Sequence, residues 1–227
     1  MVHHIIKETE SLPAPRITVF TACTPNGNKI SILLELLQIE YYIRPVDLME
    51  NEQKSDWYLK FNPNGRIPSL EYVNEKGQSI YVNESAAIMM FIVDKFDKDF
   101  KYSFPHDSKK YYEMVEWLFF QMSGLGPMKG QYHWFDVYAP QKDEFATDRY
   151  YKETLRLFGV IDERLARNGT GFLVGDHLSI ADIACYPWII LRQLKETDDF
   201  HHLTKWINTL TEIQGVKNGC NVLPSLI

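Results

Sequence analysis

The sequence predicts an α/β unit followed by an all-α unit, and three observations indicate this. Between residues 16 and 96, short β-rich segments alternate with amphipathic helical segments. A polar segment with a single proline follows at residues 97–107, which is typical of a linker. From residue 108 to residue 227 only helical periodicities are found. We therefore expect a tail at 1–15, a mixed sheet flanked by helices, a linker and a helical domain.

The α/β unit begins with a strand at residues 16–22, because "RITVFTA" is short and rich in β-branched and aromatic residues. Apolar residues at i, i+3, i+4 and i+7 within residues 30–37 then predict an amphipathic helix. The remaining elements are a strand at 41–48, a short helix at 53–61, a hairpin formed by 67–73 and 78–82, and a helix at 84–96.

Four helices are predicted in the second unit, at residues 109–122, 145–167, 180–194 and 201–213. Three glycines and a proline interrupt the periodicity within residues 121–135, and several aromatic residues follow them. This segment is either an ordinary helix–loop–helix corner or the aromatic wall of a second-substrate pocket. The residues of that pocket would be Met128, Tyr132, His133 and Trp134.

Composition and charge exclude several classes of function. The 227 residues are 45% hydrophobic and 24% charged, which is typical of a soluble globular protein. A net charge of -6 without a basic stripe argues against a nucleic-acid partner. The longest uncharged apolar run lies within residues 183–191, well short of the ~20 residues that span a bilayer. The first residues lack the apolar core of a signal peptide, and no membrane partner is expected.

The cysteines and histidines predict neither a disulfide framework nor a metal site. Cys23, Cys185 and Cys220 are odd in number and widely separated, without zinc-ligand spacing. The paired histidines at 3–4 and 201–202 are adjacent, so the two members of each pair diverge on a regular element. We expect a reducing, cytoplasmic environment and no metal cofactor.

A sharp turn from strand to helix follows Cys23, in the stretch "TPNG" of residues 24–27. A helix N-terminus presents free N–H groups and a partial positive charge, so this turn suggests a binding site. The stretch "NPNGRIP" ends in Pro68 at the start of a predicted strand. Pro68 is either an ordinary trans proline or a cis proline that leaves the Ile67 backbone free to pair with a peptide-like ligand.

Two further stretches place capping residues before helices. In "NES", Ser85 is a favoured helix cap, but together with Glu84 it would also fit the carboxylate and ammonium of an amino-acid head group. In "SIAD", Ser179 and Asp182 have the spacing of a capping box. We assign the second stretch a structural role, so loss of Asp182 should impair folding rather than catalysis.

Five motifs, in order, resemble those of the glutathione transferases. They are "TPNGNK", "NPNGRIPSL", "NESAAI", "WLFFQMSGLGPMKGQ" and "FLVGDHLSIADIACYPW". The chain is most similar to the branch with the bacterial nu-class enzymes and the globular domain of the yeast nitrogen-regulator prion protein. This resemblance, over residues 16–222, implies a thioredoxin-like N-terminal domain, a helical C-terminal domain and a homodimer that binds glutathione. Apolar Ala86, Met89 and Met90 support the dimer.

The resemblance also implies roles for individual residues. Thr24 and Asn26 face the glutathione sulfur, Gln53 and Arg66 lie near the glycyl end, Ile67 before a cis Pro68 pairs with the cysteinyl unit, and Glu84 and Ser85 hold the γ-glutamyl head. Glutathione carries two carboxylates and one ammonium, which these groups complement. Donors at the turn would lower the thiol pKa from its usual ~8.5 and so increase the reactive thiolate.

We therefore expect a glutathione transferase-like enzyme that reduces disulfides with glutathione and conjugates electrophiles more weakly. Two alternatives stay open. One is a thioltransferase in which Cys23 is the nucleophile, although Cys23 lies one residue earlier than the usual position for such a cysteine. The other is a regulatory protein that has kept the glutathione pocket and acts through partners. Cys23 as a small buried apolar residue is the simpler interpretation.

Overall fold

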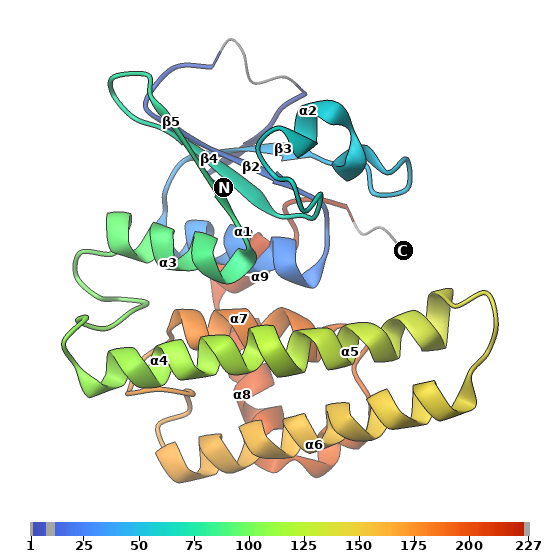
Figure 1. The fold of residues 1–227 in the computed structure, drawn as a ribbon. Coiled ribbons are helices and arrows are strands. Elements are labelled where there is room, and N and C mark those ends of the chain that lie inside the picture. Colours follow the sequence, from blue (N-terminus) through green and yellow to red (C-terminus); the bar gives the residue numbers. More distant parts are fainter. Residues whose placement is uncertain (1, 8–11, 225–227) are drawn as a thin grey trace. The chain divides into compact units, whose positions relative to one another are not determined.

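The computed structural model describes residues 2–7 and 12–224, and the chain divides into two compact units (Figure 1). Unit 1 consists of Met1–Lys98 together with Glu212–Ile227, and unit 2 is Asp99–Thr211. The division after Lys98 falls inside the predicted linker. Unit 1 is thioredoxin-like and unit 2 is helical, as the sequence predicts.

Unit 1 is built on a mixed five-stranded sheet in the order β1-β3-β2-β4-β5. The strands are β1 (His3–Ile5), β2 (Arg16–Thr21), β3 (Tyr41–Pro45), β4 (Ser69–Val73) and β5 (Ser79–Asn83). β1, β3 and β2 are parallel, and β4 pairs antiparallel with both β2 and β5. β2 is central, and every residue of it after Arg16 is buried, as expected for a strand that is covered on both faces.

Helices cover both faces of this sheet. In Figure 1, α1 (Pro25–Leu37) and α3 (Ser85–Phe96) lie on one side of it, and α2 (Asp56–Leu59) lies on the other. A short 3₁₀ turn, η1 (Glu52–Lys54), precedes α2. Tyr58 of α2 packs with Phe20 and Val46 in a buried cluster. The short α2 is therefore stabilised by this aromatic cluster rather than by its own length.

Two elements of unit 1 lie outside the predicted α/β segment. β1, in the predicted tail, pairs with β3, and His3 Nδ1 lies 2.8 Å from Glu35 Oε1 of α1. α9 (Gln214–Cys220), in the segment predicted for the helical domain, packs against α1. A Cβ on Gly219 would lie 2.3 Å from Ile32 Cα, so glycine permits the close approach of the two helices. The three residues of β1 are too few to show an alternation of apolar and polar residues. The glycines of α9 interrupt its helical periodicity.

Unit 2 contains the four predicted helical segments. Its elements are α4 (Lys109–Phe120), η2 (Gln121–Leu125), α5 (Gly126–His133), η3 (Trp134–Tyr138), α6 (Glu144–Asn168), α7 (Ile180–Ile190), η4 (Lys195–Asp199) and α8 (His201–Glu212). α7 is apolar on every side and nearly every residue in it is buried. It forms the core helix around which the amphipathic helices of this unit pack.

The helix–loop–helix corner considered for residues 121–135 is wrong, because the chain stays helical there. η2 is a π-helical turn, in which the Gly126 N–H donates to Gln121 O, five residues earlier. Pro127 has no N–H and normally interrupts a helix. The π turn shifts the hydrogen-bond pattern just before Pro127 and allows α4 to pass into α5 without a loop.

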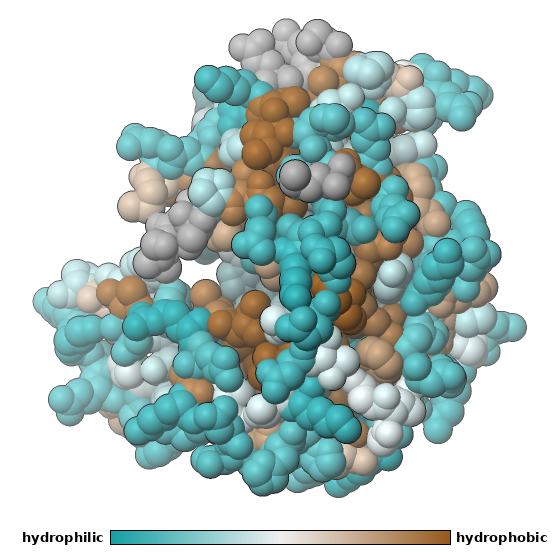
Figure 2. Space-filling model, turned by 180° about the vertical axis from the view of Figure 1, so that it is seen from behind, coloured by the Kyte–Doolittle hydropathy of each residue, from teal (hydrophilic) through white to brown (hydrophobic). Residues whose placement is uncertain are grey.

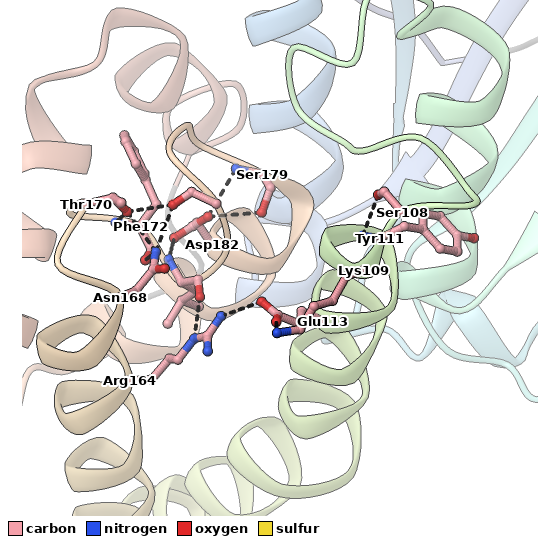
Figure 3. A network of polar contacts seen from close by, with 12 residues as sticks. Ser108, Lys109, Tyr111, Glu113, Arg164, Asn168, Thr170, Phe172, Ser179 and Asp182 are labelled. Carbon is pink, nitrogen blue, oxygen red and sulfur yellow. Dashed lines mark hydrogen bonds and ion pairs between the residues drawn. The ribbon is translucent and has the colours of Figure 1, made fainter.

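A polar network holds the loop between α6 and α7 (Figure 3). Asp182, which is fully buried, accepts hydrogen bonds from the backbone N–H groups of Leu173 at 2.8 Å and Ser179 at 3.0 Å. It also accepts from Ser179 Oγ at 3.1 Å and from Trp206 Nε1 at 2.9 Å. Arg164 Nε donates to Leu173 O at 2.6 Å. The Ser179–Asp182 capping box thus anchors three segments of unit 2.

The described helices include none that is both long enough and apolar enough to cross a membrane. On the face of the molecule shown in Figure 2, hydrophobic residues form separate patches between hydrophilic ones.

Candidate functional site

The sheet register brings the predicted site segments of unit 1 to one edge. Phe20 near the end of β2 is paired with Ser69, the first residue of β4, and Ser69 is paired with Asn83, the last residue of β5. The turn into α1, the Ile67–Pro68 peptide and the start of α3 therefore leave the sheet at the same edge. β3 runs parallel to β2, with Thr21 opposite Pro45, so the chain toward η1 leaves there too.

The turn into α1 explains its unusual residues. Thr24 is the N-cap, and its Oγ1 accepts a hydrogen bond from Gly27 N at 3.2 Å. Pro25 begins the helix where no N–H partner exists. A Cβ on Gly27 would lie 2.4 Å from Ala22 O and from Thr21 Oγ1, so only glycine fits against the end of β2. With Oγ1 accepting from the backbone, the Thr24 hydroxyl can donate its proton to a ligand.

Asn26 lies half-buried in the first turn of α1, and Cys23 lies half-buried just before it. Burial raises the pKa of the Cys23 thiol above its ordinary value. Burial, with a smaller contribution from Cys23, raises the pKa of the Cys220 thiol to about 11. The thiolate is the nucleophilic form of cysteine, and a raised pKa depletes it. The surroundings of Cys23 therefore oppose a role as nucleophile.

The Ile67–Pro68 peptide is cis, and the backbone around it is held by buried side chains. Arg66 O accepts from Asn62 Nδ2 at 2.7 Å and from Tyr58 OH at 2.8 Å. Asn62 and Tyr58 also reach Ser69 Oγ, at 2.8 Å and 2.9 Å. Within the described residues, neither backbone polar group of Ile67 has a hydrogen-bond partner. Both groups are therefore available to pair with a peptide-like ligand.

Gln53 in η1 carries an unsatisfied polar atom. Its Oε1 is buried and has no hydrogen-bond partner among the described residues. A Cβ on Gly65 would lie 2.8 Å from Gln53 O, which places Gln53 beside the turn that leads to Arg66. Lys54 Nζ donates to Asn64 O at 2.9 Å, and both Lys54 and Arg66 are exposed. An N–H group of a ligand could donate a hydrogen bond to Gln53 Oε1. The two cations Lys54 and Arg66 lie near Gln53.

The start of α3 differs from the simple capping interpretation of Ser85. Glu84 is the N-cap residue, with φ 70° and ψ 122°, and Ser85 is already the first helical residue. A positive φ is unusual for glutamate, and such residues cluster at ligand sites. Asn64 Nδ2 donates to Glu84 Oε1 at 3.4 Å, which ties this end of α3 to the turn before Arg66.

Lys29 is a residue that the sequence analysis missed. It is 0% exposed, and its Nζ donates to Ser85 Oγ at 3.1 Å. The helix dipole disfavours a cation in the first turns of a helix, so a lysine there signals a special partner. Because Ser85 begins α3, the ammonium adds positive charge to a helix end that already favours an anion.

Two of the four residues predicted for a second-substrate pocket line one pocket of the structure. Tyr132 and His133 line a pocket of about 260 Å³ in unit 2, whereas Met128 and Trp134 are not among its lining residues. Trp134 is 45% exposed. A neighbouring pocket of about 530 Å³ is lined by Tyr132 but by none of the other three. In the described part of the chain, no group of three or more His, Cys, Asp or Glu side chains is placed to hold a metal ion.

The chain is similar to known proteins in both of its units. Residues 24–95 match the N-terminal domain of glutathione S-transferases, and residues 122–213 match their C-terminal domain. The disulfide-bond oxidoreductase YfcG of Escherichia coli (strain K12) is 37% identical over 175 residues, which cover 76% of this chain and 79% of YfcG.

Solved structures show the same similarity over both units. A glutathione transferase homolog from Lodderomyces elongisporus, crystallised with two GSH per subunit, has a TM-score of 0.89 and 37% identity over 92% of this chain and 99% of that one. Ure2p in complex with glutathione has a TM-score of 0.84 and 30% identity over 92% and 100% of the chains. The chain belongs to the glutathione S-transferase family.

Proposed function

We propose that the protein binds glutathione at this edge of unit 1 and uses it to reduce disulfides, with weaker conjugation of electrophiles. The observation that carries the proposal is the sheet register. It places the first turn of α1, the unpaired backbone of Ile67 and the start of α3 at one edge. Glutathione has a thiol for the turn into α1, peptide groups for the Ile67 backbone and a zwitterionic head for the start of α3.

The γ-glutamyl head pairs with the start of α3. Glu84 supplies a carboxylate for its ammonium, and Ser85 with the helix N-terminus receives its carboxylate. Lys29, which donates to Ser85 Oγ, strengthens the attraction for that carboxylate.

The cysteinyl and glycyl units of glutathione bind to groups that have no partner within the described residues, and to nearby cations. The cysteinyl unit pairs with the backbone N–H and C=O of Ile67, as a strand would. Gln53 Oε1 accepts a hydrogen bond from a ligand N–H, which satisfies its buried oxygen. Arg66 and the neighbouring Lys54 attract the glycyl carboxylate.

The sulfur lies at the turn into α1, where Thr24 OH and Asn26 Nδ2 donate hydrogen bonds that favour the thiolate. The thiolate attacks one sulfur of a bound disulfide, forming a mixed disulfide and releasing the other sulfur as a thiolate that takes up a proton. A second glutathione thiolate then attacks the mixed disulfide at its glutathione sulfur, which yields glutathione disulfide and the second reduced thiol. No protein cysteine is consumed. Because the cycle requires reduced glutathione, we place the protein in the cytoplasm.

The direct test is turnover of hydroxyethyl disulfide by the purified protein with glutathione, followed by formation of glutathione disulfide. We expect a rate well above the uncatalysed exchange. Glutathione binding without such turnover would instead support the regulatory binding protein, and absence of binding would contradict both.

Glu84→Ala and Ser85→Ala should each weaken glutathione binding and leave the fold intact. Each substitution removes a partner of a charged ligand group, which costs about 1.5–3 kcal/mol, or roughly tenfold or more in affinity. Calorimetric titration with glutathione measures the effect. Glu75→Ala, in the exposed turn between β4 and β5, is the matched control and should bind like the parent. Unchanged affinity in both site variants would mean that the head group binds elsewhere.

The protein should be a homodimer in solution. β5 is an edge strand of the sheet, with Ile80 46% exposed and Tyr81 45% exposed, and Phe61 stacks on Tyr81 at 5.0 Å between ring centroids. Met89, expected to support the dimer, is instead 0% exposed within unit 1. Light scattering should give about twice the chain mass of 26.6 kDa, and Ile80→Glu should shift it toward the monomer. A parent protein that stays at 26.6 kDa at micromolar concentrations would refute this.

A further inference from the structure

A pocket of about 260 Å³ lies within unit 2, between α5, α6 and residues 192–196. α5 contributes Lys129, Tyr132 and His133 to its wall, η3 contributes Asp136, and α6 contributes Tyr151. Lys129 is 1% exposed, although lysine is almost never fully buried unless it is paired. Lys129 lines the pocket, so a ligand in the pocket lies against its side chain.

The charges around the pocket are paired except for one. Arg192 Nη1 lies 3.5 Å from Asp136 Oδ2, and Lys195 Nζ lies 3.6 Å from Glu196 Oε1. Lys129 forms no ion pair with any carboxylate of the described residues. Its Nζ donates one long hydrogen bond, of 3.3 Å, to Arg192 O.

Aromatic rings provide the remaining surroundings of this ammonium. Lys129 Nζ lies 5.6 Å from the ring centroids of both Tyr132 and Phe158. A buried ammonium has three N–H donors and is costly without a counter-charge. Burial, together with the nearby Arg192 charge, lowers the pKa of Lys129 to about 8, while Asp136 opposes this shift. The pocket therefore presents one cation whose missing partner is a single negative charge.

We propose that this pocket binds a small aromatic monocarboxylate, whose carboxylate pairs with Lys129 and whose ring packs against Tyr132. One unpaired cation matches one carboxylate, because Arg192 and Lys195 already have acidic partners. Tyr132, Tyr151 and Leu194 supply aromatic and apolar lining for the rest of the ligand. The volume lies below the ~300–1,000 Å³ of ordinary ligand pockets, so the ligand is small. The site lies within unit 2 and is separate from glutathione binding in unit 1.

Calorimetric titration with benzoate at pH 7 tests the charge pairing. We expect binding to the parent protein, and a loss of about tenfold or more with benzamide, which has the same shape without the charge. Lys129→Met keeps the length of the side chain and should cause a similar loss. Lys205→Met is the matched control, because Lys205 lies exposed on α8, is not among the lining residues of this pocket and should not affect benzoate binding.

The pH profile of the unmodified protein gives a second test that needs no variant. Benzoate pairs with the ammonium form, so its affinity should be constant well below pH 8 and fall by up to about tenfold per pH unit above it. Burial lowers the pKa of His133 and raises that of Tyr132, and burial with Glu196 raises that of Tyr151 to about 12. These pKa shifts move all three groups away from the range pH 7–9. The other charged groups that line the pocket are Asp136, Arg192, Lys195 and Glu196.

Several results would overturn the proposal. One is that the parent protein does not bind benzoate at concentrations up to tens of millimolar. Another is that Lys129→Met binds benzoate with the same affinity as the parent protein. A third is that the affinity for benzoate does not change between pH 7 and 9. If glutathione displaces benzoate, and Lys129→Met binds benzoate as tightly as the parent protein does, the benzoate site lies in unit 1 instead. Thermal unfolding and glutathione affinity of Lys129→Met, both expected to stay near parental values, separate this outcome from misfolding and from failure of the proposed function.

Discussion

Asn26→Ala should lose about tenfold or more of the glutathione-dependent reduction of hydroxyethyl disulfide, whereas Cys23→Ser should retain most of it. In the proposed cycle the thiolate belongs to glutathione and is stabilised by donors in the first turn of α1. Removing the Asn26 amide leaves the sulfur anion with one donor fewer. Removal of an oxyanion-hole donor, a related case, costs on the order of 10²–10³ in rate, and sulfur is a weaker acceptor than oxygen.

Cys23 differs from Asn26 because its surroundings disfavour its anion. Burial raises the pKa of its thiol, so only a small fraction is thiolate at neutral pH. A serine of nearly the same size keeps the packing before Thr24. The structure therefore gives Cys23 the environment of a small packed residue.

The pH dependence of turnover distinguishes these roles. The thiolate is the deprotonated form, so losing a donor raises the pKa of bound glutathione and moves the rise in activity to higher pH in Asn26→Ala. Cys23→Ser should keep the parental profile. A folded but inactive serine variant, or glutathione attached to Cys23 during turnover by mass spectrometry, would establish the cysteine mechanism instead.

Asp182→Ala should destabilise unit 2 by roughly 3–5 kcal/mol. The substitution leaves the N–H groups of Leu173 and Ser179 and the indole N–H of Trp206 without an acceptor. Each buried donor without a partner costs about 1–3 kcal/mol. Burial raises the pKa of the Asp182 carboxyl, and the four hydrogen bonds oppose that shift. The carboxyl is thus the shared acceptor of three segments.

Urea unfolding followed by circular dichroism and tryptophan fluorescence measures this loss. Asp176→Ala is the control, because Asp176 is an exposed acid in the same loop and its pairing with Lys110 is at the surface. It should unfold at nearly the parental urea concentration. An Asp182→Ala protein as stable as the control would show that water replaces the carboxylate at its donors.

Much of the fold could be predicted because its signals are local. The capping box of Ser179 and Asp182 needs only a spacing of three residues, and the helix of residues 30–37 shows its period directly. The same holds for the candidate site, where Thr24, Ile67 and Ser85 each follow or precede a recognisable strand.

The parts that could not be predicted depend on distant partners. β1 is recognised only by its pairing with β3, and the π turn before Pro127 only by its hydrogen bonds. Lys29 joins the candidate site because Ser85 Oγ, which is remote in sequence, accepts a hydrogen bond from its Nζ. The unpaired oxygen of Gln53 likewise follows from burial in the folded chain.

The discontinuity of unit 1 has a consequence for its biosynthesis. α9 covers the face of α1 near Ile32, but the ribosome makes α9 only after the whole of unit 2. A nascent chain that has reached residue 98 therefore holds the complete sheet and an α1 without its cover. Because domains generally fold as units during synthesis, unit 2 can mature first, and unit 1 closes only when α9 has emerged. A gene fragment that stops at Lys98 would encode an incomplete fold.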